Sequence, residues 1–275
     1  MQEIISQHPS DLIVEYMSRI YENGMTTTSG GNLSILDTDK NIWISPGSES
    51  RRLLTGHRYL AAPERPFRKI SDFLAVKKPD VVGLLEADLG SLRTGGCNQV
   101  EMLANHLGMI PYFERKYAPG SRLQKLPYWR DQGNGILLRS AADAVQKEFL
   151  SCGTKRLILE VHYCGVRFLL VHLALGRAIR SRQIRDLAQR IRPGEPTVLA
   201  GDFNTFYGED ELRFLMQYTG LRSANAAGHP TYPAWHPEKI LDHFLISPEL
   251  EVVDFDVPHL FFSDHLPLVA DLKLR

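Results

Sequence analysis

The stretch TVLAGDFN (residues 197–204) combines a buried strand with two polar side chains at its end. Its first five residues are uncharged and mostly apolar, and Asp202 and Asn204 follow at once. Polar side chains also close or interrupt other apolar runs of the chain, namely Glu86, His172, Asp242, Asp264 and His265. Because polar groups at the ends of buried strands converge at one rim of a sandwich, where clefts form, this pattern predicts a functional site.

Each of these residues has a plainer explanation when it is taken alone. A carboxylate after a strand is more often an exposed turn residue, Asn204 is consistent with an Asx turn, and His172 with a core histidine. The prediction of a site therefore rests on their joint occurrence.

The composition limits the classes of protein to consider. The chain has 275 residues, of which 43% are hydrophobic, and its 32 basic and 32 acidic residues cancel. A neutral chain argues against nucleic-acid binding through bulk positive charge. Three cysteines without C-x-x-C spacing argue against a disulfide framework or a zinc ribbon and favour a reducing compartment. We expect no signal peptide, no transmembrane segment and a cytoplasmic location.

Alternating strands and helices are predicted from residue 51 onward. The expected helices cover residues 67–78, 98–108, 181–192 and 208–220. The expected strands cover residues 80–86, 133–140, 197–204, 242–247 and 267–274, with two more in 155–175 about a turn near Gly165. Before them, a helix over 10–24 and a β-hairpin over 33–45 are expected. The pattern favours a mixed α/β sandwich over a purely parallel sheet.

Six short motifs carry a family resemblance. In chain order they are LLE (84–86), GNGILLR (133–139), VHLAL with a later SRQ (171–183), GDFN (201–204), KILDHFLIS (239–247) and SDHLPLVADL (263–272). Together they resemble the endonuclease/exonuclease/phosphatase family, which includes pancreatic-type DNases, apurinic endonucleases, sphingomyelinases and poly(A) deadenylases. The resemblance spans nearly all of residues 51–275. It implies a four-layer α/β-sandwich, with two mixed β-sheets flanked by helices, and a metal-dependent phosphoesterase.

The resemblance also implies a metal site. Glu86 would be the direct ligand of Mg²⁺ or Mn²⁺, and Asp264 would support the metal. Hard carboxylate oxygens and water are the ligands that Mg²⁺ prefers. One motif departs from the family pattern, because LLTGHRY (53–59) has Gly56 and His57 where Tyr and Asn are expected. Imidazole suits Mn²⁺ or Zn²⁺ better than Mg²⁺, so His57 implies an altered, weakened or inactive metal site. A surface histidine after a broken strand is the alternative.

The remaining motif residues have catalytic roles in the family. By resemblance, His265 would act as general base or hold the attacking water, and Asp242 would orient it. Asp202 would position or deprotonate the nucleophile, and Asn204 would donate to the developing charge on phosphorus. The phosphate would also be contacted by His172 and Asn134.

The first part of the chain resembles a different family. TTTSGGNLS (26–34), between the expected helix and hairpin, resembles the phosphate-holding loop of class II aldolases of the adducin and fuculose-phosphate type. The likeness ends at residue 48, and the chain has no H-x-H pair for the aldolase zinc. We therefore expect two parts, an aldolase-like fragment over 1–48, forming a helix–hairpin appendage, and a phosphoesterase domain over 51–275, joined by gene fusion.

The sequence does not identify the substrate. The loop 116–132 supplies Tyr128 and Arg130 for a nucleotide or lipid head group, although a solvated surface loop explains it equally well. A phosphate ester of a nucleic acid, a nucleotide or a lipid is expected as the substrate of a monomer. The alternatives are a catalytically impaired relative acting as a binding module, and a sugar-phosphate aldolase, against which the missing zinc ligands argue.

Overall fold

The computed structural model describes residues 34–36, 42–44, 54–55, 64–91, 96–117, 131–208 and 210–275. The chain divides into two compact units, Met1–Arg68 and Lys69–Arg275. In the first unit, β1 (Ser34–Leu36) pairs antiparallel with β2 (Ile42–Ile44), which confirms the predicted hairpin. The two-residue strand β3 (Leu54–Thr55) pairs with β2. The helix expected over 10–24 lies outside the described residues, and the boundary at residues 48–51 stays a prediction.

The second unit is built around a six-stranded mixed sheet with the order β11-β12-β10-β9-β8-β7. Its strands are β7 (Ala144–Phe149), β8 (Leu157–Tyr163), β9 (Val166–His172), β10 (Thr197–Asp202), β11 (Arg222–Ser223) and β12 (Asp242–Ile246). Only β9 and β10 run parallel, and they approach each other closely at Gly201. A Cβ at Gly201, where φ is +144°, would lie 1.8 Å from the carbonyl oxygen of Val171.

Two smaller antiparallel sheets complete the described strands of this unit. The three-stranded sheet has the order β4-β6-β5 and contains β4 (Val81–Asp88), β5 (Ile110–Arg115) and β6 (Gln132–Leu138). The second pairs β13 (Leu250–Asp256) with β14 (Val269–Leu274). Val252 and Leu272 of that pair pack against Val198 and Ile246 of the six-stranded sheet.

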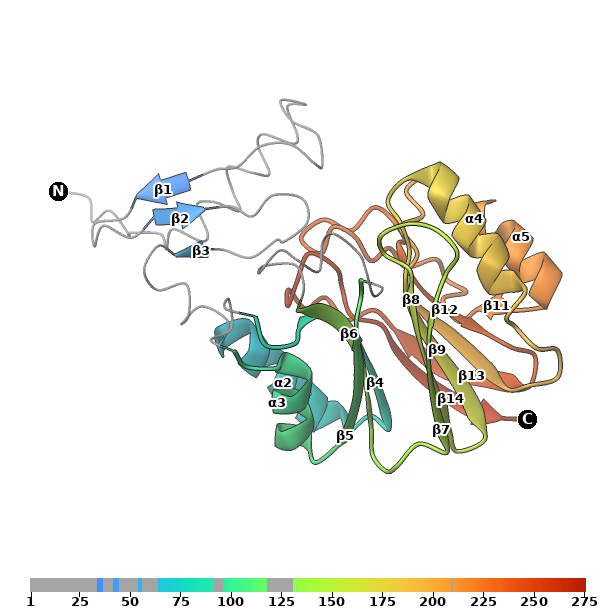
Figure 1. The fold of residues 1–275 in the computed structure, drawn as a ribbon, viewed down its shortest axis with the longest axis horizontal. Helices are drawn as coiled ribbons and strands as arrows, with labels where there is room; N and C mark the ends of the chain where they lie inside the picture. Colours follow the sequence, from blue (N-terminus) through green and yellow to red (C-terminus); the bar gives the residue numbers. More distant parts are fainter. Residues whose placement is uncertain are drawn as a thin grey trace. The chain divides into compact units, whose positions relative to one another are not determined.

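Helices cover the outer faces of the two larger sheets (Figure 1). On one side lie α2 (Glu64–Lys77) and α3 (Gln99–Leu107), and on the other α4 (Arg177–Ala188) and α5 (Asp210–Thr219). The N-cap Asn98 accepts hydrogen bonds from two backbone N–H groups of α3, and Gly108 ends that helix in the left-handed conformation. The helix was expected over residues 98–108.

Apolar side chains fill the spaces between the layers. Ile136 and Leu138 of β6 meet Leu159 and Leu170 of the six-stranded sheet in one core. A second core joins the opposite face of that sheet to α4 and α5, and includes Leu169, Leu187 and Leu215. The order helices, sheet, sheet, helices confirms the predicted α/β-sandwich. No helix in the described part of the chain is long and apolar enough to span a membrane.

Candidate active site

Three predicted site residues form a row along one end of the six-stranded sheet. His172 ends β9, Asp202 ends β10 and Asp242 begins β12. The register pairs Asp202 with His172 in the parallel direction and with Asp242 in the antiparallel direction. Since neighbouring strands are about 4.8 Å apart, the pairing itself brings the three side chains together.

Glu86 reaches the same place from the other sheet. The register between β4 and β6 shifts between Leu84 and Ala87, and Glu86 has a φ of +54°. Such an irregularity re-aims a side chain, and here Glu86 Oε1 lies 3.7 Å from His172 Nδ1. His172 is buried, and its Nδ1 has no hydrogen-bond partner among the described residues. The candidate site thus lies where the ends of the two sheets meet.

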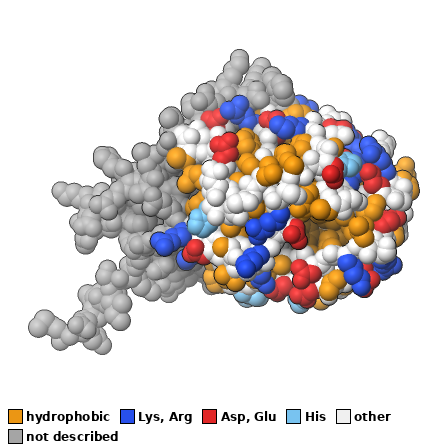
Figure 2. All heavy atoms as spheres, turned by 90° about the horizontal axis from the view of Figure 1, so that it is seen from below, with side chains coloured by type: hydrophobic (Ala, Val, Ile, Leu, Met, Phe, Trp, Pro, Cys, Tyr) orange, Lys and Arg blue, Asp and Glu red, His pale blue; other side chains and the backbone are white. Residues whose placement is uncertain are grey.

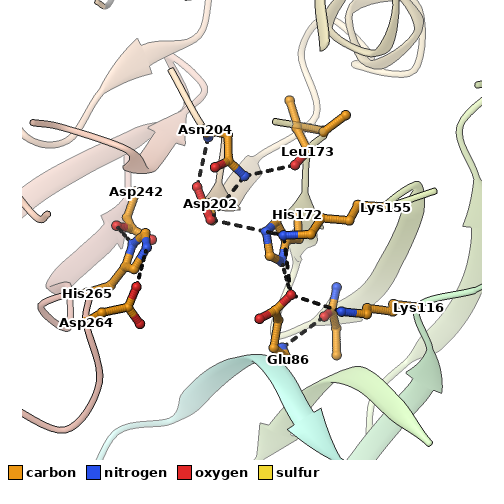
Figure 3. Close-up of polar contacts among 12 residues, drawn as sticks. Glu86, Lys116, Lys155, His172, Leu173, Asp202, Asn204, Asp242, Asp264 and His265 are labelled. Carbon is orange, nitrogen blue, oxygen red and sulfur yellow. Dashed lines mark hydrogen bonds and ion pairs between the residues drawn. The ribbon is translucent and has the colours of Figure 1, made fainter. Parts of the chain in front are cut away.

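Two lysines surround the Glu86 carboxylate (Figure 3). The Nζ of Lys116 lies 3.0 Å from Glu86 Oε1, and that of Lys155 lies 3.3 Å from the same oxygen. Lys155 Nζ also lies 2.7 Å from His172 Nε2. Burial alone would raise the pKa of Glu86, but the charges of His172, Lys116 and Lys155 outweigh burial and hold the pKa well below its ordinary value. Glu86 is therefore an ionised carboxylate in a cationic setting.

Asp202 and Asn204 form a tight turn at the end of β10. The backbone N–H of Asn204 donates to Asp202 Oδ1 at 2.8 Å. Asn204 Nδ2 donates to Asp202 Oδ2 at 3.2 Å and to the carbonyl oxygen of Leu173 at 2.9 Å. Both amide hydrogens are therefore engaged, so donation from Asn204 to a substrate would require one of these bonds to break.

The Asp202 carboxylate is ionised at neutral pH. Its Oδ2 lies 3.2 Å from His172 Nε2. Burial alone would raise the pKa of Asp202, but the charge and hydrogen bond of His172 outweigh it and lower the pKa from 3.8 to about 2.

His265 forms a close pair with Asp242. His265 Nδ1 lies 2.7 Å from Asp242 Oδ2, and Thr231 Oγ1 donates to the same oxygen at 2.7 Å. Burial alone would lower the pKa of His265, but the carboxylate of Asp242 outweighs burial and raises the pKa to about 9. Burial raises the pKa of Asp242 against the opposing charge of His265. His265 is therefore an imidazolium at neutral pH, and its other ring nitrogen lies 3.5 Å from Asp264 Oδ2.

The donor set fits a divalent cation. Asp202, Asp242 and His265 each offer a ligand atom, and these atoms all lie within 4.8 Å of one another. Carboxylate oxygens suit Mg²⁺ and Mn²⁺, and an imidazole nitrogen favours Mn²⁺, but His265 would have to lose a proton to ligate either ion. This group differs from the predicted metal ligands, of which Glu86 lies across the site, Asp264 lies beside His265 (Figure 3), and His57 is outside the described residues.

The structure brings most of the predicted site residues together. Those gathered here are Glu86, His172, Asp202, Asn204, Asp242, Asp264 and His265, and the buried Asn134 accepts from the backbone N–H of Glu86 at 3.4 Å. Tyr128 and Arg130 lie outside the described residues. Lys155 was not predicted, and Lys116 was considered only as part of a loop. A basic residue at the start of an expected strand is too common a pattern to single out Lys155.

The chain matches the Endonuclease/Exonuclease/phosphatase family over residues 45–265. No sequence among curated proteins matches it significantly. Among solved structures, a conserved protein of unknown function from Enterococcus faecalis V583 is 14% identical, with a TM-score of 0.63 over 80% of this chain and 94% of the other.

Two further solved structures have similar scores. The catalytic domain of human nocturnin is 20% identical, with a TM-score of 0.59 over 78% of this chain and 90% of that one. A mannosyl-6-phosphatase from Bacteroides thetaiotaomicron VPI-5482 is 16% identical, with a TM-score of 0.59 over 77% and 91%. At these identities the structures show a shared fold.

Proposed function

The chain belongs to the endonuclease/exonuclease/phosphatase family, and from this premise we propose that it is a divalent-metal-dependent phosphoesterase. The reaction is hydrolysis of a phosphate ester by in-line attack of water. One observation carries the proposal: the row of His172, Asp202 and Asp242 faces Glu86, and the Asp242–His265 pair completes it. Carboxylates, an oriented imidazole and two ammonium groups supply what a phosphoester transition state needs.

His265 acts in its protonated form. With a pKa raised to about 9, it is an imidazolium at neutral pH, and Asp242 holds its Nδ1. We assign it to donate from Nε2 to a phosphate oxygen, rather than to take a proton from water. Asp202, ionised at neutral pH, orients the attacking water and accepts its proton. Asp202 thus takes both of the roles that the sequence left open for it, and His265 takes neither of its two.

The two lysines beside Glu86 supply positive charge next to the place proposed for the phosphate. Lys155 contacts both Glu86 and His172, so its ammonium group can turn to a phosphate oxygen without leaving the site. We assign Lys155 and Lys116 to stabilise the negative phosphoryl group. Glu86 and Asp264 would hold Mg²⁺ or Mn²⁺, and the group of Asp202, Asp242 and His265 is the alternative position. When bound, the ion supplies further charge neutralisation at the phosphate.

The substrate is a small or single-stranded phosphate ester rather than long duplex DNA. In the face shown in Figure 2, basic and acidic side chains are intermingled and form no continuous basic stripe. The formal net charge is zero. A long duplex is normally held by many cationic contacts to its phosphates, and neither observation supports them. One related structure is named a phosphatase, which supports testing monoesters beside diesters.

The proposal is tested with bis-p-nitrophenyl phosphate and p-nitrophenyl phosphate in Mg²⁺ or Mn²⁺. We expect hydrolysis that stops on chelation with EDTA and returns with added metal. A panel of single-stranded DNA, RNA, a phosphoinositide and sphingomyelin would then define the substrate. Absence of metal-dependent hydrolysis on every member would reject the proposal and leave a binding module.

The Asp242→Asn variant tests the protonated role of His265. The native enzyme should lose activity as the pH rises through about 9, because His265 then loses its proton. Removing the Asp242 charge takes away the largest of the influences that raise the His265 pKa against burial and leaves the smaller ones of Asp202 and Asp264, so the alkaline limb should move down by about 1–3 pH units. The measurement is kcat/KM for bis-p-nitrophenyl phosphate against pH. Activity that instead increases through pH 9 would show that His265 is a base.

A further inference from the structure

The side-chain amide of Gln183 links two segments that carry site residues. Gln183 lies on α4 and is fully buried. Its Oε1 accepts from the backbone N–H of Ala174 at 2.8 Å. Its Nε2 donates to the carbonyl oxygens of Cys152, at 2.9 Å, and of Lys155, at 2.7 Å. Both amide hydrogens and the amide oxygen are thus used on backbone groups.

Two of these backbone groups, those of Ala174 and Lys155, belong to segments that carry site residues. Ala174 comes two residues after His172, on the turn whose Leu173 carbonyl accepts from Asn204. Lys155 belongs to the connection between β7 and β8, and its Nζ lies 2.7 Å from His172 Nε2. A single amide therefore fixes the main chain of Lys155 relative to the turn that follows His172.

The connection between β7 and β8 packs closely against the Gln183 amide. Its Gly153 has a φ of +94°, and a Cβ there would lie 2.7 Å from Gln183 Nε2. The backbone N–H of Ser151 donates to Asp186 on the next turn of α4 at 2.7 Å. Glycine is the residue that both the backbone conformation and the close approach of Gln183 favour at position 153.

Gln183 contacts both the turn after His172 and the connection that carries Lys155. A second buried residue shows which of these two segments depends on Gln183. Arg180 donates to the carbonyl oxygens of Ala174, at 3.0 Å, and Leu175, at 2.6 Å, and pairs with Glu211. The turn after His172 is therefore held by Arg180 as well. Of the two side chains, only Gln183 has a hydrogen bond to the connection that carries Lys155 among the described contacts.

We infer that Gln183 is a positioning residue that holds Lys155 against His172 for contact with the phosphate of the substrate. The inference rests on the proposed phosphoesterase function. Gln183 itself touches neither substrate nor reacting atoms. Its effect on the reaction passes through the Lys155 main chain, and a displacement of about 1 Å in a catalytic group can cost on the order of 10²-fold in rate.

The test is a double-mutant cycle between Gln183→Met and Lys155→Ala, measured as kcat/KM for bis-p-nitrophenyl phosphate in Mn²⁺. Met fills a similar volume and has no amide. Gln183→Met should lower kcat/KM by about 10–100-fold in the native background. In the Lys155→Ala background the same change should cost less than about threefold, because the group it positions is gone. The control is Gln189→Met, at an exposed glutamine that caps the same helix, which should leave the rate unchanged.

Gly153→Ala perturbs the same contact from the connection and does not change Gln183. Like Gln183→Met, it should lower kcat/KM in the native background. In the Lys155→Ala background it should have little effect. This variant decides the question if Gln183→Met does not fold, as judged by thermal unfolding. Equal losses in both backgrounds, or no loss from either variant, would overturn the inference while leaving the phosphoesterase intact. A native enzyme without metal-dependent hydrolysis would overturn both.

Discussion

His265→Gln should lower kcat/KM for bis-p-nitrophenyl phosphate by about 10²–10³-fold, the range typical of losing one donor to the charge that develops in the transition state. Glutamine keeps a polar side chain of comparable reach but carries no positive charge. The loss follows from the pairing with Asp242, which makes His265 an imidazolium aimed into the site at neutral pH. Initial rates at pH 7.5 in saturating Mn²⁺ measure the effect.

The control for this variant is His236→Gln. His236 has a 78% exposed side chain that contacts only Glu238 among the described ion pairs. Its replacement should leave the rate within about twofold. Since His265 and Asp242 act as one unit, the double variant His265→Gln/Asp242→Asn should be little slower than His265→Gln alone. Fully additive losses would show that the two residues act separately.

The row of site residues was predictable because each of them ends, begins or interrupts an apolar run. TVLAGDFN and FLLVHLAL are long enough to be buried strands, with Asp202 at the end of the first and His172 inside the second. The structure ends β9 at His172. The pairing of Asp202 with both His172 and Asp242 follows once the three strands are neighbours. The resemblance supplied the family, which the match over residues 45–265 confirms.

The contacts of Lys155 were not predictable in the same way. They depend on a connection folded around Gln183 and on the irregular backbone at Glu86, and neither leaves a periodic signal. Some strands were missed for a related reason. β7 (AVQKEF) is an edge strand with mostly exposed side chains, so it lacks the alternation of a half-buried strand. β5 begins with Ile-Pro and pairs with β6 at the sheet edge, where a proline is tolerated.

The Glu86 carboxylate is both a proposed metal ligand and the partner of two lysines, and these two interactions oppose each other. As a proposed metal ligand it must present a free carboxylate, but Lys116 and Lys155 both contact its Oε1. An ammonium group and a divalent cation repel each other when both lie against one carboxylate. Metal binding at Glu86 is therefore opposed by the two lysines, and a substrate phosphate is the anion that would draw them away. Metal and substrate should consequently bind with positive cooperativity.

Glu86→Gln should weaken Mn²⁺ binding and lower hydrolysis by at least about 10²-fold, more than the loss of an outer partner of a metal ligand usually costs. Isothermal titration with Mn²⁺ alone provides a readout apart from activity. Lys155→Ala should have the opposite effect on binding, tightening Mn²⁺ by removing a competing cation 3.3 Å from Glu86 Oε1. The matched control is Glu238→Gln, at an exposed carboxylate that should change neither quantity.

The same titration separates the two possible positions of the ion. If Glu86 is the ligand, Asp202→Asn should reduce the rate but leave Mn²⁺ affinity within about threefold of the native value. If the ion instead lies in the group of Asp202, Asp242 and His265, the affinity should fall with Asp202→Asn and not with Glu86→Gln. That second result would contradict the assignment of Glu86 and make its carboxylate a partner of Lys116 and Lys155. The lysines would then be held by Glu86 for the phosphate, and the loss of activity in Glu86→Gln would arise from their displacement.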